Sequence, residues 1–74
     1  MAMVRQMNAM PLEKNSKHTE VNCTYTIVVE DDGQRYLQVD TYGSPTREIL
    51  EKKSQTIRFS PEAIEQLKII LNQL

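Results

Sequence analysis

The stretch that decides the fold is CTYTIVVEDDGQRYLQVDTY, which runs from residue 23 to residue 42. The two ends of this stretch are rich in β-branched and aromatic side chains, which favour strands. Between them, Asp31-Asp32-Gly33 is typical of a turn. The sequence therefore predicts an antiparallel hairpin at the centre of the fold.

The length of the hairpin loop fixes which side chains share a face. A two-residue loop would mix apolar and polar side chains on both faces. A three-residue loop with Gly33 in the left-handed region pairs Glu30 with Gln34 and separates the two kinds, so we expect this loop. The apolar face then consists of Tyr25, Ile27, Val29, Leu37 and Val39. The polar face consists of Thr24, Thr26, Val28, Tyr36, Gln38, Asp40 and Tyr42.

Residues 56–74 predict a short strand that leads into a helix. The strand places Arg58 on the polar side, and Ser60-Pro61-Glu62 is typical of a helix start because it supplies a cap, a proline and an acid in order. The apolar stripe of the helix consists of Ala63, Ile64, Leu67, Ile70, Leu71 and Leu74. Ile69 falls outside this stripe, which we interpret as a contact with a second chain, the alternative being a single exposed side chain.

Two segments carry no comparable pattern. We expect residues 1–22 to form a flexible tail, the alternative being a methionine-rich helix that docks on a partner. Between residues 43 and 60 the chain carries four basic and two acidic side chains, and Ile49 and Leu50 are candidates for a further short strand. The prediction is an α+β domain over residues 23–74, with an antiparallel sheet of three to four strands followed by one C-terminal helix (ββββα).

Composition excludes several classes of protein. The 74 residues carry nine basic and ten acidic side chains, and no apolar run approaches the ~20 residues that a membrane helix needs. We expect no signal peptide, and therefore a cytoplasmic or nucleoid-associated protein. Cys23 is the only cysteine and His18 the only histidine, which is too few for a disulfide, a closed metal site or an oriented nucleophile. We therefore expect no enzyme activity, no metal and no cofactor.

The run from Val28 to Leu74 matches a known order of segments. These are Glu30-Asp-Asp-Gly33, Tyr36-Leu-Gln-Val-Asp-Thr-Tyr42, Glu51-Lys-Lys-Ser54, Ile57-Arg-Phe-Ser60 and Pro61-Glu-Ala-Ile-Glu-Gln-Leu-Lys68. The run resembles the single-stranded-DNA-binding domain of the transcriptional coactivator positive cofactor four and its small prokaryotic and phage-like relatives. The resemblance implies a homodimer with paired helices and a sheet that binds nucleic acid. It also implies that Tyr42, Lys52 and Lys53 contact the nucleic acid.

The leading hypothesis is a small dimeric protein that binds single-stranded DNA or RNA and regulates transcription or replication. A second chain is expected because a domain of about 50 residues buries only ~60 % of its unfolded surface. Tyrosines on the polar face suit stacking on bases, the alternative being that they only pack on their neighbours, and basic side chains suit phosphates. The predicted binding residues are Arg35, Tyr36, Tyr42, Arg47, Lys52, Lys53 and Arg58.

The alternative hypothesis is a protein-interaction module that keeps the fold and binds a partner protein, as an antitoxin-like or phage-type regulator would. Asp31 and Asp32 stand where the resembled family has an aromatic residue and a lysine. Residues 23–74 carry eight acidic and six basic side chains, whereas nucleic-acid binders usually carry a basic excess. Binding to an oligonucleotide separates the two hypotheses.

Overall fold

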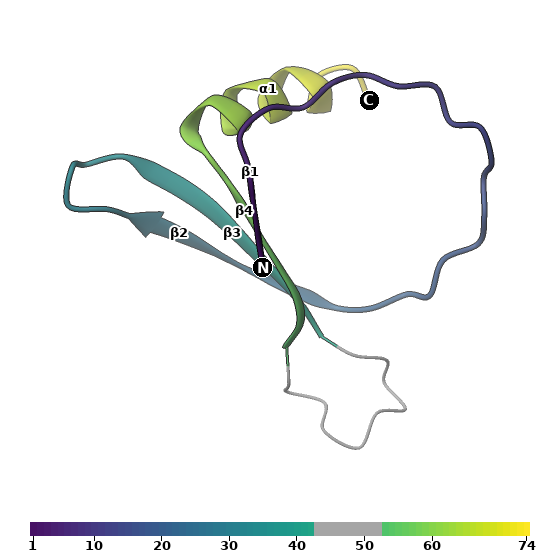
Figure 1. Ribbon diagram of the computed structural model, residues 1–74, viewed down its shortest axis with the longest axis horizontal. Helices are drawn as coiled ribbons and strands as arrows, with labels where there is room; N and C mark the ends of the chain where they lie inside the picture. The colour runs from purple at the N-terminus through teal and green to yellow at the C-terminus, as the bar shows by residue number, and fades with distance from the viewer. Residues whose placement is uncertain (43–52) are drawn as a thin grey trace.

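The computed structural model describes residues 1–42 and 53–74, which form a four-stranded sheet with a C-terminal helix against it (Figure 1). The elements are β1 (Ala2–Val4), β2 (Cys23–Val29), β3 (Arg35–Tyr42), β4 (Lys53–Phe59) and α1 (Pro61–Leu71). The strand order in the sheet is β1-β4-β3-β2. The predicted small α+β fold with one C-terminal helix is confirmed. The candidate strand around Ile49 and Leu50 lies outside the described residues.

The hairpin of β2 and β3 has the predicted register. Ile27 pairs with Leu37 and Tyr25 with Val39. In the loop, the Glu30 amide donates to the Gln34 carbonyl oxygen at 3.0 Å. Gly33 has a φ of 81°, a left-handed conformation that costs glycine little and other residues more. The three-residue loop is therefore confirmed, and with it the separation into an apolar and a polar face.

β4 continues this alternation on the other side of β3. It runs antiparallel to β3, with Phe59 opposite Leu37 and Arg58 opposite Gln38. The register shifts between Thr41 and Tyr42, so that Tyr42 pairs with Lys53. Arg58 accordingly lies on the polar face, as the sequence predicted.

The first residues of the chain do not form the predicted tail. Ala2–Val4 forms β1, which pairs in parallel with β4 and makes the sheet mixed rather than antiparallel. The Ser60 amide donates to the Val4 carbonyl oxygen at 2.9 Å, and the Met7 amide donates to Gln66 Oε1 at 2.7 Å. These bonds cover an edge of β4 whose backbone groups would otherwise need water. The tail prediction is wrong for this segment, whereas residues 8–22 are exposed throughout.

Helix α1 begins as predicted and covers part of the apolar face. Ser60 is the N-cap, and its Oγ accepts a hydrogen bond of 3.2 Å from the Ala63 amide. Ala63 is fully buried, whereas in β2 Tyr25 is 73 % exposed and Ile27 is 59 % exposed. Among the described residues, no apolar side chain larger than alanine is buried. The helix therefore leaves the apolar side of β2 open to water.

Candidate nucleic-acid interface

The polar face lies on the side of the sheet away from α1. Alternation along the strands puts Gln38 and Arg58 on the opposite side from Ile27 and Leu37, which line a groove together with the helix. The polar face consists of Thr24, Thr26, Val28, Glu30, Tyr36, Gln38, Asp40, Tyr42, Thr56 and Arg58. No helix in the described part of the chain covers it, so its exposed side chains are accessible to a ligand.

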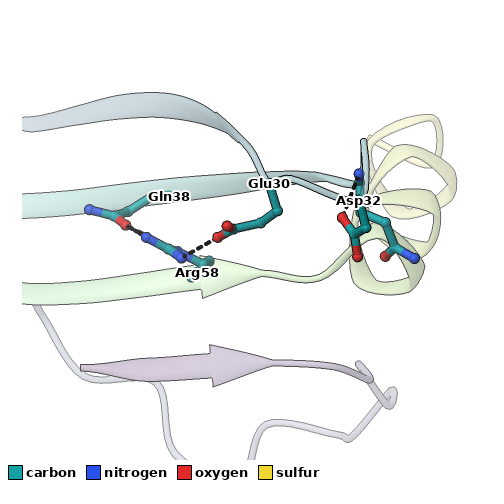
Figure 2. Close-up of polar contacts among 5 residues, drawn as sticks. Glu30, Asp32, Gln38 and Arg58 are labelled. Atoms are coloured by element: carbon teal, nitrogen blue, oxygen red, sulfur yellow. Dashed lines mark hydrogen bonds and ion pairs between the residues drawn. The ribbon is translucent and has the colours of Figure 1, made fainter.

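Arg58 is held by two neighbours on this face. Figure 2 shows its guanidinium group between Gln38 and Glu30. Arg58 Nε donates to Gln38 Oε1 at 3.1 Å, and Nη2 donates to the same oxygen. Arg58 Nη1 lies 3.6 Å from Glu30 Oε1. The positive charge is thus positioned by the amide and partly neutralised by the carboxylate.

The same network continues to a buried carboxylate. Gln38 Nε2 donates to both carboxylate oxygens of Asp40, at 3.3 Å and 3.2 Å. Thr56 Oγ1 donates to Asp40 Oδ1 at 2.6 Å. Asp40 is only 3 % exposed, so these bonds compensate for the removal of its charge from water. The network fixes the side-chain positions at the centre of the face.

The electrostatics of the face are mixed. Glu30 and Asp40 supply negative charge, and Arg58 supplies positive charge. Glu30 and Arg58 are both part-exposed, and an ion pair of this kind contributes only ~0–1 kcal/mol. The Glu30 carboxylate therefore holds the Arg58 guanidinium only weakly.

The two predicted tyrosines occupy the two ends of the face. The Tyr42 hydroxyl forms a hydrogen bond of 2.8 Å with Thr24 Oγ1, which joins β3 to β2. Tyr36 pairs with Val28 near the hairpin loop. Both tyrosines are half-buried, so each retains an accessible part. The hydroxyl bond restricts the orientation of the Tyr42 ring.

The structure does not gather all the predicted basic residues. Arg35 is exposed at the start of β3, and its pairing with Val29 puts it on the apolar side of the sheet; Arg35 and Tyr36 both border the groove next to α1. Lys53 begins β4 opposite Tyr42. Arg47 and Lys52 lie outside the described residues. Of the predicted set, Tyr36, Tyr42 and Arg58 therefore share the polar face, and Arg35 does not.

Sequence analysis missed two contributors to this face. Glu30 lies two residues after Val28 and therefore falls on the same face as Gln38, so the hairpin register alone could have placed it there. Met3 lies in β1, opposite Arg58, and borders a groove of about 200 Å³ lined by Met1, Ala2, Met3, Gln38, Thr56 and Arg58. No sequence pattern marked β1 as part of the sheet, so nothing could have placed Met3 there.

A second concave surface lies between the hairpin and α1. This groove, of about 500 Å³, has an apolar lining that includes Ile27, Leu37 and Ile64. Its charged lining residues are Arg35, Glu62, Glu65 and Lys68. Lys68 Nζ lies 3.2 Å from Glu65 Oε1, so part of this charge is already paired. The groove continues the exposed apolar side of β2.

The remaining findings concern metals, membranes and known proteins. Within residues 1–42 and 53–74, no group of three or more His, Cys, Asp or Glu side chains is placed to hold a metal ion. No helix of the same residues is long and apolar enough to cross a membrane. Comparisons of the chain with protein-family models, with curated proteins and with solved structures found no match.

Proposed function

We propose that the protein binds single-stranded nucleic acid as a homodimer and acts as a small regulator of transcription or replication. The observation that carries the proposal is the polar sheet face, which no described helix covers and which holds Tyr36, Tyr42 and Arg58. Aromatic rings that stack on bases, next to cations that meet phosphates, are the combination by which proteins bind single strands. The resemblance to positive cofactor four supports the same function.

The dimeric state rests on the apolar side of the sheet. Tyr25, Ile27 and Val29 are exposed there, and Leu71 is exposed on the helix. Large contiguous apolar patches on a soluble protein usually mark an interaction surface. A second copy that covers β2 and the end of α1 would provide the core that a single chain lacks.

The test is a fluorescence-anisotropy titration of a labelled oligonucleotide at two salt concentrations. Tyr42→Ala removes a stacking ring, and we expect binding weaker by ~1–3 kcal/mol with an unchanged salt slope. Tyr42→Phe is the matched control, because it keeps the ring and removes only the hydrogen bond to Thr24. Equal weakening by the two substitutions would show that the ring does not stack.

The basic residues should respond differently from the tyrosine. Lys52→Ala together with Lys53→Ala removes two phosphate contacts, and each contact contributes ~0.7 to the salt slope for single strands. We expect weaker binding and a flatter slope. An unchanged slope would remove these lysines from the interface.

Glu30 offers a test with the opposite sign. Glu30→Gln removes the carboxylate that faces Arg58, so the arginine becomes available to a phosphate, and we expect tighter binding with a slope steeper by ~0.7. Glu13→Gln is the matched control, because it makes the same change of charge in the exposed segment after β1. Equal effects of the two substitutions would contradict a role for Arg58.

The acidic hairpin tip should weaken binding by repelling phosphate. Asp32 Oδ1 accepts a hydrogen bond of 2.9 Å from the Gln34 amide, so Asp32→Lys changes the turn as well as the charge. Asp31→Lys makes the same change of charge without removing that bond. We expect both substitutions to strengthen binding at low salt, and Asp31→Lys to do so with the smaller loss of stability.

The second candidate is a protein-interaction module without nucleic-acid binding. The groove between the hairpin and α1 favours it, because it combines an apolar lining with charged residues. The Glu30 carboxylate at Arg58 favours it as well. If the protein binds no oligonucleotide in a salt-dependent way at ~50 mM salt, where charges are least screened, this function replaces the first.

A further inference from the structure

Strand β1 occupies an unusual place in the sheet. It is the first strand in the chain, yet it lies at the opposite edge from β2, which follows it in the sequence. It pairs in parallel with β4, Ala2 opposite Ile57 and Val4 opposite Phe59. It is also bonded at its end, where the Ser60 amide donates to the Val4 carbonyl oxygen. Segment 2–7 therefore docks on β4 and α1 as a small separate unit.

The connection from this unit to the rest of the sheet is long and exposed. Residues 8–22 have no buried side chain, and Figure 1 shows the chain crossing over α1 in this view before it runs in a wide arc back to β2. The hydrogen bonds that the structure gives this segment are local, with one exception. The carbonyl oxygen of Asn22, just before β2, accepts a hydrogen bond from the amide of Tyr42 at the end of β3. The connection therefore makes no contact that would keep β1 on the β4 strand of the same chain.

We propose that segment 2–7 exchanges between two copies of the chain, so that β1 of one copy pairs with β4 of the other. Exchange preserves every bond that β1 makes, because the edge of β4, Ser60 and Gln66 are the same in both copies. A tether of this length gives an effective concentration in the ~mM range in either arrangement once two bodies are held together.

The exposed apolar side of β2 and α1 argues for a second copy as the partner. That surface includes Tyr25, Ile27 and Val29 of β2 and Leu71 of α1, which are all more than half exposed in the single chain. In a dimer formed through this surface, each chain has its own long exposed connection of residues 8–22, so that β1 of one chain could reach β4 of the other. The inference rests on the dimeric part of the proposed function and not on nucleic-acid binding.

Disulfide trapping between two different chains tests the exchange. One chain carries Ala2→Cys and the other carries Ile57→Cys, both in a Cys23→Ser background. These positions are partners in the parallel register, and neighbouring strands lie ~4.8 Å apart, within the range that a disulfide bridges. The two chains are unfolded together in urea, refolded, oxidised mildly and separated without reductant. A mixture of Ala2→Cys with Thr24→Cys measures random collision, because Thr24 lies on β2 at the far edge.

Exchange predicts a disulfide-linked dimer from the first mixture and a much weaker band from the control mixture. Equal bands overturn the inference. A chain that carries both Ala2→Cys and Ile57→Cys is the folding control, because it forms a disulfide in either arrangement. If all of these disulfides form within single chains, exchange is also overturned. Sedimentation of the wild-type protein separates the two proposals: a dimer with equal bands overturns only the exchange, whereas a monomer overturns both the exchange and the proposed dimer.

Discussion

A lysine in place of Ile27 should dissociate the proposed dimer. Ile27 is 59 % exposed in the single chain, and full burial of an isoleucine contributes ~1.5–3 kcal/mol. Covering the exposed part is therefore worth ~1–2 kcal/mol per chain, which becomes ~2–4 kcal/mol in a twofold dimer that uses the surface twice. We expect the dissociation constant to rise by about 30-fold to 1,000-fold, and further because a buried lysine charge costs more.

Sedimentation equilibrium over a range of concentrations measures this change. Leu12→Lys is the matched control, because Leu12 is 75 % exposed in the segment after β1 and lies outside the apolar face. Circular dichroism shows whether dissociation of the Ile27→Lys variant is accompanied by unfolding, which we expect at low concentration because the second copy supplies part of the core. The reasoning is refuted if Ile27→Lys and Leu12→Lys sediment alike, or if the wild-type protein is a stable monomer.

Further predictions concern Ile69, Ser60, Gly33 and Glu62. Ile69→Glu should weaken the dimer in sedimentation if Ile69, which is exposed, lies in the interface, and an unchanged dimer would show that it does not. Ser60→Ala removes the cap on the Ala63 amide and should lower the urea midpoint by an amount equivalent to ~1 kcal/mol, whereas an unchanged midpoint would contradict the role of the cap. Gly33→Ala should destabilise the hairpin by ~1–2 kcal/mol in the same assay, because it forces a side chain into the left-handed region. The pKa of Glu62 is lowered, first by a hydrogen bond to its own backbone amide and then by the Ser60 side chain and the Arg5 charge. The ionised Glu62 therefore contributes its full stabilisation above the ordinary glutamate pKa of about 4.3. This contribution is lost as the pH falls through the lowered pKa. Glu62→Gln should flatten the loss of stability in acid, and an identical acid profile would rule out this contribution.

The hairpin could be predicted in detail because two independent signals agree. Alternation of apolar and polar residues selects the three-residue loop over a two-residue loop, Gly33 suits the left-handed position that this loop needs, and a slip of one residue would reverse every side chain. The start of the helix could be predicted equally well, since Ser60-Pro61-Glu62 combines an N-cap, a proline at the first helical position and an acid in the first turn. These features depend on neighbours in the sequence, which is why sequence reasoning reached them.

Strand β1 and the contacts of Arg58 were not predictable in the same way. Three residues are too few for a periodic signal, and β1 exists because a distant strand leaves an open edge beside it. The pairing of Arg58 with Gln38 and Glu30 depends on the register between β3 and β4, which the alternation of residues within each strand does not fix. Sequence reasoning therefore placed Arg58 on the right face but presented it as available to a phosphate, without the carboxylate beside it.

The most direct test of the proposed function is a two-dimensional amide spectrum of the labelled protein, recorded while a short single-stranded oligonucleotide is added at low salt. The account predicts shifts that concentrate on the polar face, including the side-chain signals of Gln38 and Arg58, with little change at Ile64 and Lys68 in the helix-side groove. Shifts confined to that groove, or no shifts at all, would contradict it.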